Sequence, residues 1–86
     1  MPEISRFYGI VIQMYFDEHP PAHFHARYGG NAIQVGINPI RVLEGELERR
    51  ALSLVLEWAA LHQTELIENW NRMRRDDPAL PIEPLH

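Results

Sequence analysis

Four turn signals divide the first half of the chain into short apolar segments. They are Pro20 with Pro21, Gly29 with Gly30 and Asn31, Asn38 with Pro39, and Gly45. Proline removes a backbone donor and glycine takes positive φ without strain, so each of these places favours a turn. The intervening segments, 6–16, 23–28, 32–37 and 40–44, are rich in β-branched and aromatic residues, which favour strands. We therefore expect a four-stranded antiparallel β-meander over residues 1–45.

The first segment, 6–16, is apolar at almost every position. Alternation along one strand places Tyr8, Ile10, Ile12, Met14 and Phe16 on a common face. Because the opposite face is also largely apolar, we expect a strand that is covered on both sides. Gly9 is typical of a bulge within such a strand. In the third segment, alternation turns Ile33, Val35 and Ile37 inward.

One long helix, over residues 46–75, is predicted to follow the meander and pack on it. Seven residues recur at alternating spacings of four and three: Leu52, Leu56, Ala59, Gln63, Leu66, Trp70 and Met73. This period places them on one face of a helix. A break between residues 62 and 64, with Thr64 as the cap of a second helix, is the alternative, but a single helix is preferred. The expected fold class is α+β.

The first half of this helix carries more apolar surface than one sheet can bury. Leu54, Trp58 and Leu61 form a second apolar stripe there. Such a stripe predicts a homo-oligomer, a partner protein or a C-terminal tail that folds back. The tail, 76–86, contains three prolines, so it is expected to be disordered or to form an extended arm. An extended arm would place Leu80, Ile82 and Leu85 on a surface.

Segment 17–30 contains the residues best suited to catalysis or metal binding, including three of the five histidines. Because side chains alternate along a strand, His23, His25 and Arg27 share one polar face. The opposite face is apolar and consists of Phe24, Ala26 and Tyr28. Two imidazoles about 7 Å apart along a strand suit a metal ion, a phosphate or a carboxylate.

Three uses of these histidines remain open. As catalytic residues, His23 and His25 would move protons during metal-free RNA cleavage, with Arg27 stabilising the charge on phosphorus. As metal ligands, His19, His23 and His25 would form a zinc or nickel site open to water. As structural residues, they would fix the proline turn through hydrogen bonds, and this interpretation is preferred to the metal site. No cofactor is therefore expected, with zinc or nickel as the alternative.

Composition limits the classes of protein that this chain can represent. Its 86 residues suffice for one domain, 1–86. The absence of cysteine excludes disulfides and thiolate metal sites. The net charge of -4 argues against a general nucleic-acid binder. The start MPEIS lacks the cationic stretch and apolar core of a signal peptide. The longest apolar tract, 51–61, is too short to span a membrane. We therefore expect a cytoplasmic protein.

Arg49 and Arg50 stand where the predicted helix begins, and the helix dipole disfavours cations at that end. We therefore consider them contacts for an acidic partner or a phosphate backbone. Leu54, Trp58 and Leu61 would extend the same partner surface. A solvated arginine pair screened by nearby glutamates is the simpler alternative.

Three stretches of the sequence resemble one known family. They are MPEISRFYGIVIQMYFDEHPPAHFHARYG, LERRALSLVLEWAALHQTELIENW and IEPL. The family is the small bacterial and archaeal domain of unknown function DUF 4160, and the pattern HPPxHFHAxYG, here 19–29, is its specific part. Members often occur beside or fused to another small domain. The resemblance therefore implies one component of a two-gene toxin-antitoxin-like module that binds a small protein from a neighbouring gene, with RNA as a further candidate partner. It implies no established enzyme activity.

Overall fold

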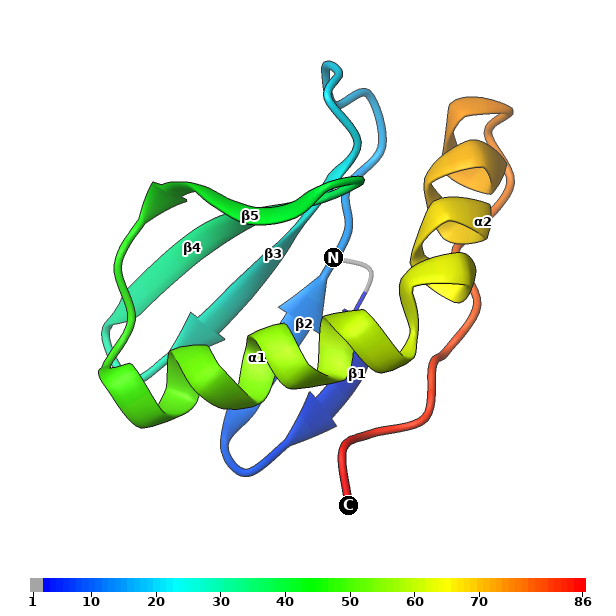
Figure 1. Ribbon diagram of the computed structural model, residues 1–86. Helices are drawn as coiled ribbons and strands as arrows, with labels where there is room; N and C mark the ends of the chain where they lie inside the picture. The colour runs from blue at the N-terminus through cyan, green and yellow to red at the C-terminus, as the bar shows by residue number, and fades with distance from the viewer. Residues whose placement is uncertain (1–2) are drawn as a thin grey trace.

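The computed structural model describes residues 3–86 and shows a five-stranded antiparallel sheet followed by two helices (Figure 1). The strands are neighbours in chain order: β1 (Glu3–Phe7), β2 (Ile10–Gln13), β3 (His23–Tyr28), β4 (Asn31–Ile37) and β5 (Ile40–Gly45). The helices are α1 (Arg49–Leu61) and α2 (Gln63–Arg74). The α+β class and the meander are confirmed, but the meander has five strands instead of four. The first two residues of the predicted range 1–45 lie outside the described residues.

The prediction of one strand over 6–16 is wrong, because the chain reverses at Tyr8 and Gly9. Phe7 pairs with Ile10, which leaves a two-residue hairpin loop. Both loop residues have positive φ, 51° for Tyr8 and 79° for Gly9, as in a type I′ turn. Gly9 therefore forms a hairpin turn and not the expected bulge, and glycine takes this conformation without strain.

The core lies on the face of the sheet that α1 crosses (Figure 1). Residues that alternation placed on this face are fully or almost fully buried: Ile10, Ile12, Met14, Ile33, Val35 and Ile37. Tyr8 and Phe16 were assigned to the same face but are exposed. Tyr8 lies in the hairpin loop, and Phe16 lies beyond the end of β2. On the other face Val11 is half-buried and Gln13 is 8% exposed, so the second face of β2 is covered in part.

The predicted single helix is two helices that meet at His62. His62 has φ −121° and ψ 25°, which ends α1, and α2 begins at the next residue, so Thr64 is not its cap. Gln63 Nε2 donates a hydrogen bond to the carbonyl of Ile37, at 2.7 Å, and ties the bend to the end of β4. α2 turns away from α1 (Figure 1) and buries Leu66, Trp70 and Met73. Within the described residues, neither helix is long and apolar enough to cross a membrane.

Trp58 is a core residue and not part of an exposed stripe. Its side chain is 0% exposed, and its ring centroid lies 5.5 Å from that of Phe7 and 5.7 Å from that of Phe24. Of the other two residues in the predicted stripe, Leu54 is half-buried and Leu61 is 65% exposed. Of the stripe inferred from helical spacing, only Trp58 is therefore fully buried within the chain.

The segment after α2, residues 77–86, folds back over the core and is called the C-terminal arm below. The Ile82 N–H donates to the carbonyl of Ile4 in β1, and Trp58 Nε1 donates to the carbonyl of Glu83, both at 2.8 Å. Ile82 and Leu85 are 5% and 9% exposed. The arm is thus the element that covers the surplus apolar surface of α1.

α2 holds the start of the C-terminal arm through polar contacts. Asn69 Nδ2 donates to the carbonyl of Leu80, and the Leu80 N–H donates back to Asn69 Oδ1, both at 2.8 Å. Arg72 Nε donates to the carbonyl of Pro78 at 2.9 Å. The side chain of Leu80 is exposed, whereas those of Ile82 and Leu85 pack into the core of the same chain.

Candidate metal centre

β3 presents two histidines on the face that points away from the core. Phe24 and Ala26 are fully buried against α1, so alternation turns His23 and His25 to the opposite side. This confirms the face assignment made from the sequence. Arg27 lies further along the same face and is exposed.

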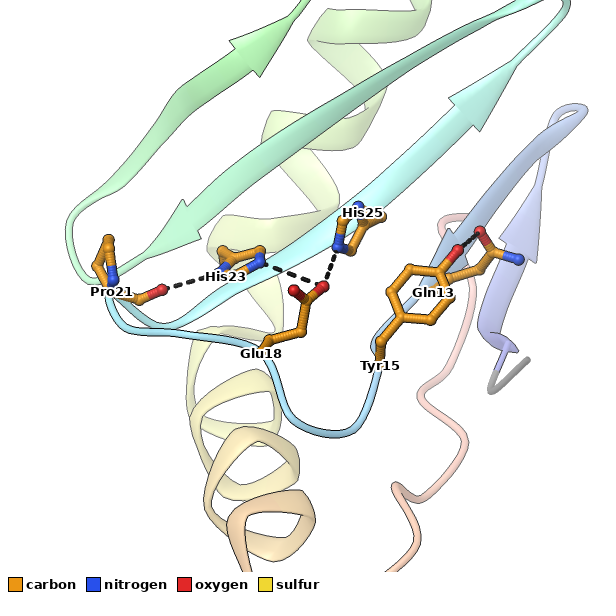
Figure 2. Close-up of polar contacts among 6 residues, drawn as sticks. All are labelled: Gln13, Tyr15, Glu18, Pro21, His23 and His25. Carbon is orange, nitrogen blue, oxygen red and sulfur yellow. Dashed lines mark hydrogen bonds and ion pairs between the residues drawn. The ribbon is translucent and has the colours of Figure 1, made fainter.

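The loop between β2 and β3 brings a carboxylate onto the two histidines. Asp17 has φ 60°, a left-handed conformation that turns the chain just before Glu18. Figure 2 shows the Glu18 carboxylate between the two imidazoles. Its Oε1 lies 2.5 Å from His25 Nε2 and 3.5 Å from His23 Nε2.

Glu18, His23 and His25 form a group of side chains that could hold a metal ion. One ligand atom from each residue lies within 4.8 Å of the other two. In a tetrahedral zinc site the ligand atoms are separated by about 3.3 Å, so small side-chain rotations would allow these three to surround one ion. His19, the third ligand expected from the sequence, is exposed and does not belong to this group. The structure places Glu18 where the sequence predicted His19.

His23 is already arranged as a ligand. Its Nδ1 lies 2.8 Å from the carbonyl oxygen of Pro21. Because a carbonyl only accepts, Nδ1 carries the proton and Nε2 carries the lone pair of the neutral imidazole. Metal-bound histidines usually have their other nitrogen bonded in this way. The His23 side chain is 6% exposed, and its Nε2 is buried with no hydrogen-bond partner in the part of the chain that the structure describes.

In the neutral tautomer with the proton on Nδ1, His23 Nε2 faces Glu18 Oε1 as a second acceptor. The 3.5 Å between the two atoms is too long for a hydrogen bond, and a lone pair facing a carboxylate is repelled by it. Leaving a buried polar group unpaired costs about 1–3 kcal/mol. A proton on His23 would relieve this cost for one pair of atoms. A divalent cation would relieve it for all three ligand atoms together.

Aromatic rings hold the two imidazoles in place. The Tyr15 ring meets His25 edge-on with centroids 4.6 Å apart, and the Tyr15 hydroxyl donates to Gln13 Oε1 at 2.8 Å. Trp70 of α2 lies 5.3 Å from the ring of His23. Elements far apart in the sequence thus restrict the rotation of both histidines, as a preorganised site requires.

The arginines and apolar residues proposed as partner contacts lie elsewhere. Arg49 and Arg50 are exposed at the start of α1, where the Glu48 side chain accepts a hydrogen bond from the Arg50 N–H at 2.7 Å. Arg50 and Leu54 line a small hollow beside Tyr28, at the far end of β3 from His23. The structure does not bring these residues to the histidine cluster.

Comparison with known proteins gives a family and no activity. The family model described as a domain of unknown function, DUF4160, matches residues 9–71, which include the three residues of the candidate metal centre. No curated protein and no solved structure matches the chain.

Proposed function

This chain belongs to the DUF4160 family of domains of unknown function, and we propose that it binds a divalent transition-metal ion through Glu18, His23 and His25. The observation that carries the proposal is the buried Nε2 of His23, which faces the other two ligands without a hydrogen-bond partner among the described residues. A metal ion satisfies that atom, while the Pro21 carbonyl fixes the tautomer that leaves its lone pair free.

The donor set favours zinc. Two imidazole nitrogens and one carboxylate suit zinc, nickel or iron(II) better than magnesium or calcium, which prefer oxygen ligands alone. Three protein ligands leave one position of a tetrahedral ion open, as in catalytic zinc sites. A water at that position would lose a proton near neutral pH, so the site would be suited to hydrolysis.

Metal content after purification without an affinity tag tests the proposal. We expect about one zinc ion per chain by mass spectrometry, and an increase in melting temperature when zinc is added to chelator-treated protein. His23→Ala should lose the ion and the thermal response. His19→Ala is the matched control, since His19 is exposed and lies outside the cluster, and it should retain both.

Glu18→Gln separates loss of the metal from loss of the fold. This change keeps the shape of the side chain but removes the charge that binds the ion, so the variant should fold and load zinc poorly. Loading should also fall as the pH is lowered, because protons compete for the same lone pairs. Equal zinc content in His23→Ala and His19→Ala, or no thermal response of the wild-type protein, would contradict the proposal.

Metal-free RNA cleavage by His23, His25 and Arg27 is the second candidate function. The contact between Glu18 and His25 supports it, because a carboxylate of this kind orients an imidazole for proton transfer. This mechanism predicts RNA cleavage that survives a chelator and has a bell-shaped pH profile. It also predicts that His25→Ala abolishes the cleavage. Such chelator-resistant activity would replace the metal proposal.

A partner protein or a second copy of the chain stays a prediction, as does the toxin-antitoxin-like module that the family resemblance implied. Trp58 of the stripe is buried, so the remaining support is the exposed side chain of Leu61. If Leu61 lies in an interface, light scattering should give a mass above the 10.1 kDa of one chain, and Leu61→Asp should restore the mass of one chain. A wild-type protein that measures as one chain, alone and after co-expression with its gene neighbour, would contradict this prediction.

A further inference from the structure

A hollow of about 440 Å³ opens beside the candidate metal centre, on the face of the sheet opposite α1. Two of the three proposed ligands, Glu18 and His23, form part of its wall. Gln34 of β4 and Arg41 of β5 form the other side. The hollow therefore connects two of the proposed metal ligands to the one arginine in its lining.

Strand register explains why Arg41 faces His23. His23 pairs with Gly36, and Gly36 pairs with Arg41, so the three residues form one row on the same face. Neighbouring strands are about 4.8 Å apart, which places the Cα atoms of His23 and Arg41 about 10 Å apart. Gly36, between them, has no side chain. The two ends of the row can therefore reach toward the same small ligand.

Arg41 is free to bind such a ligand. Its side chain is exposed and makes no ion pair or hydrogen bond with residues 3–86. Arg6 pairs with Glu3 at 2.7 Å, and Arg72 donates to the carbonyl of Pro78, so those two are occupied. Arg27, Arg49 and Arg50 also form no side-chain ion pair or hydrogen bond with the described residues, but only Arg41 lines this hollow. A guanidinium presents two parallel N–H groups that match the oxygens of a phosphate or carboxylate.

We propose that the hollow binds a phosphate group, with one oxygen on the metal ion and another on the Arg41 guanidinium. This inference rests on the proposed metal function. A divalent ion and Arg41, less the charge of Glu18, leave about two positive charges, which a phosphate dianion neutralises and a single carboxylate does not. The Gln34 side chain, in the same lining, supplies an amide donor for a further oxygen.

Cobalt(II) in place of zinc makes the binding visible, because its absorption spectrum changes when its ligands change. We expect inorganic phosphate and adenosine monophosphate each to alter the spectrum of the cobalt-loaded full chain, with acetate much weaker. Arg41→Gln should load cobalt normally, while its midpoint for phosphate rises at least about tenfold, as expected for a lost hydrogen bond between charged groups. Arg50→Gln is the matched control, because Arg50 is exposed and lies outside this hollow.

The outcomes distinguish this inference from the metal proposal. A cobalt spectrum that does not respond to phosphate, or an equal midpoint in Arg41→Gln and wild type, overturns the phosphate site and leaves the metal site standing. Equal responses to acetate and phosphate overturn the choice of a dianion. A chain that gives no cobalt spectrum before any phosphate is added removes both proposals. A response to inorganic phosphate but not to adenosine monophosphate supports a site for the free ion.

Discussion

Replacing Trp58 by alanine is expected to lower the free energy of unfolding by about 3–5 kcal/mol, the usual cost of deleting a buried aromatic side chain. The indole is fully buried between the rings of Phe7 and Phe24, so its removal leaves a cavity at the centre of the core. Small domains are stable by only about 5–15 kcal/mol. Urea denaturation followed by circular dichroism should therefore show a large decrease in the midpoint.

Two further variants separate the contributions of Trp58. Trp58→Phe retains much of the apolar volume but loses the hydrogen bond to the Glu83 carbonyl, so its smaller cost should include about 1 kcal/mol for that bond. Leu61→Ala, on the next turn of α1 and 65% exposed, should change stability by less than about 0.5 kcal/mol. If Leu61→Ala lowered the free energy of unfolding as much as Trp58→Ala, the sheet would not pack on the Trp58 face of α1.

The face on which each side chain of β3 and β4 lies could be predicted, because it depends on local strand geometry alone. Successive side chains of a strand point to opposite faces, so the buried set in β4 and the outward direction of His23 and His25 followed directly from sequence order. The turn signals set where those strands begin. The α+β class followed from a run of strands before a segment with helical period.

Neither the first hairpin nor the helix break has a clear signal in the local sequence. Segment 6–16 is continuous in apolar character, so its pattern suits one long strand as well as two short ones. The turn at Tyr8 and Gly9 also lacks the Asn-Gly or Asp-Gly pair that usually signals a type I′ hairpin. At His62, one non-helical residue leaves the apolar spacing almost unchanged, while the bond from Gln63 to Ile37 is visible only in the folded chain.

Two of the three residues of the candidate metal centre, His23 and His25, were predicted from the sequence, and Glu18 was not. The histidines lie on a strand, whose geometry is regular, whereas Glu18 lies in a loop whose path depends on the left-handed conformation of Asp17. The adjacent His19 had the more obvious ligand chemistry, but the loop turns it to solvent. Tight loops without repeating geometry give no rule for which of two neighbouring side chains points inward.

The C-terminal arm shows how proline content can mislead. Three prolines argue against a helix, but they also remove backbone donors and favour extended chain. A segment of this kind can lie along a domain with few backbone hydrogen bonds, and the bond from the Ile82 N–H to Ile4 is one of them. The sequence left a disordered tail and an extended arm open, and it offered a tail that folds back as one of three covers for the helix.

Deleting residues 78–86 is expected to destabilise the domain about as strongly as Trp58→Ala. The deletion removes the buried side chains of Ile82 and Leu85, each worth about 1.5–3 kcal/mol. It also leaves Trp58 Nε1 without its acceptor, the Glu83 carbonyl. Thermal unfolding should occur at a much lower temperature, and hydrogen exchange should increase at the edge strand β1, which loses the bond between Ile4 and the arm.

Point substitutions in the full-length chain distinguish the stability that comes from the buried side chains of the arm from the effect of shortening the chain. The double change Ile82→Ala with Leu85→Ala should reproduce most of the loss, because it removes the two buried side chains of the arm and keeps its backbone. Leu80→Ala is the matched control, since that side chain is exposed and only its backbone bonds to Asn69. A truncated chain with the wild-type melting temperature would show that α1 and the sheet are stable without the arm. In that event the surface around Trp58 would again be available to a partner.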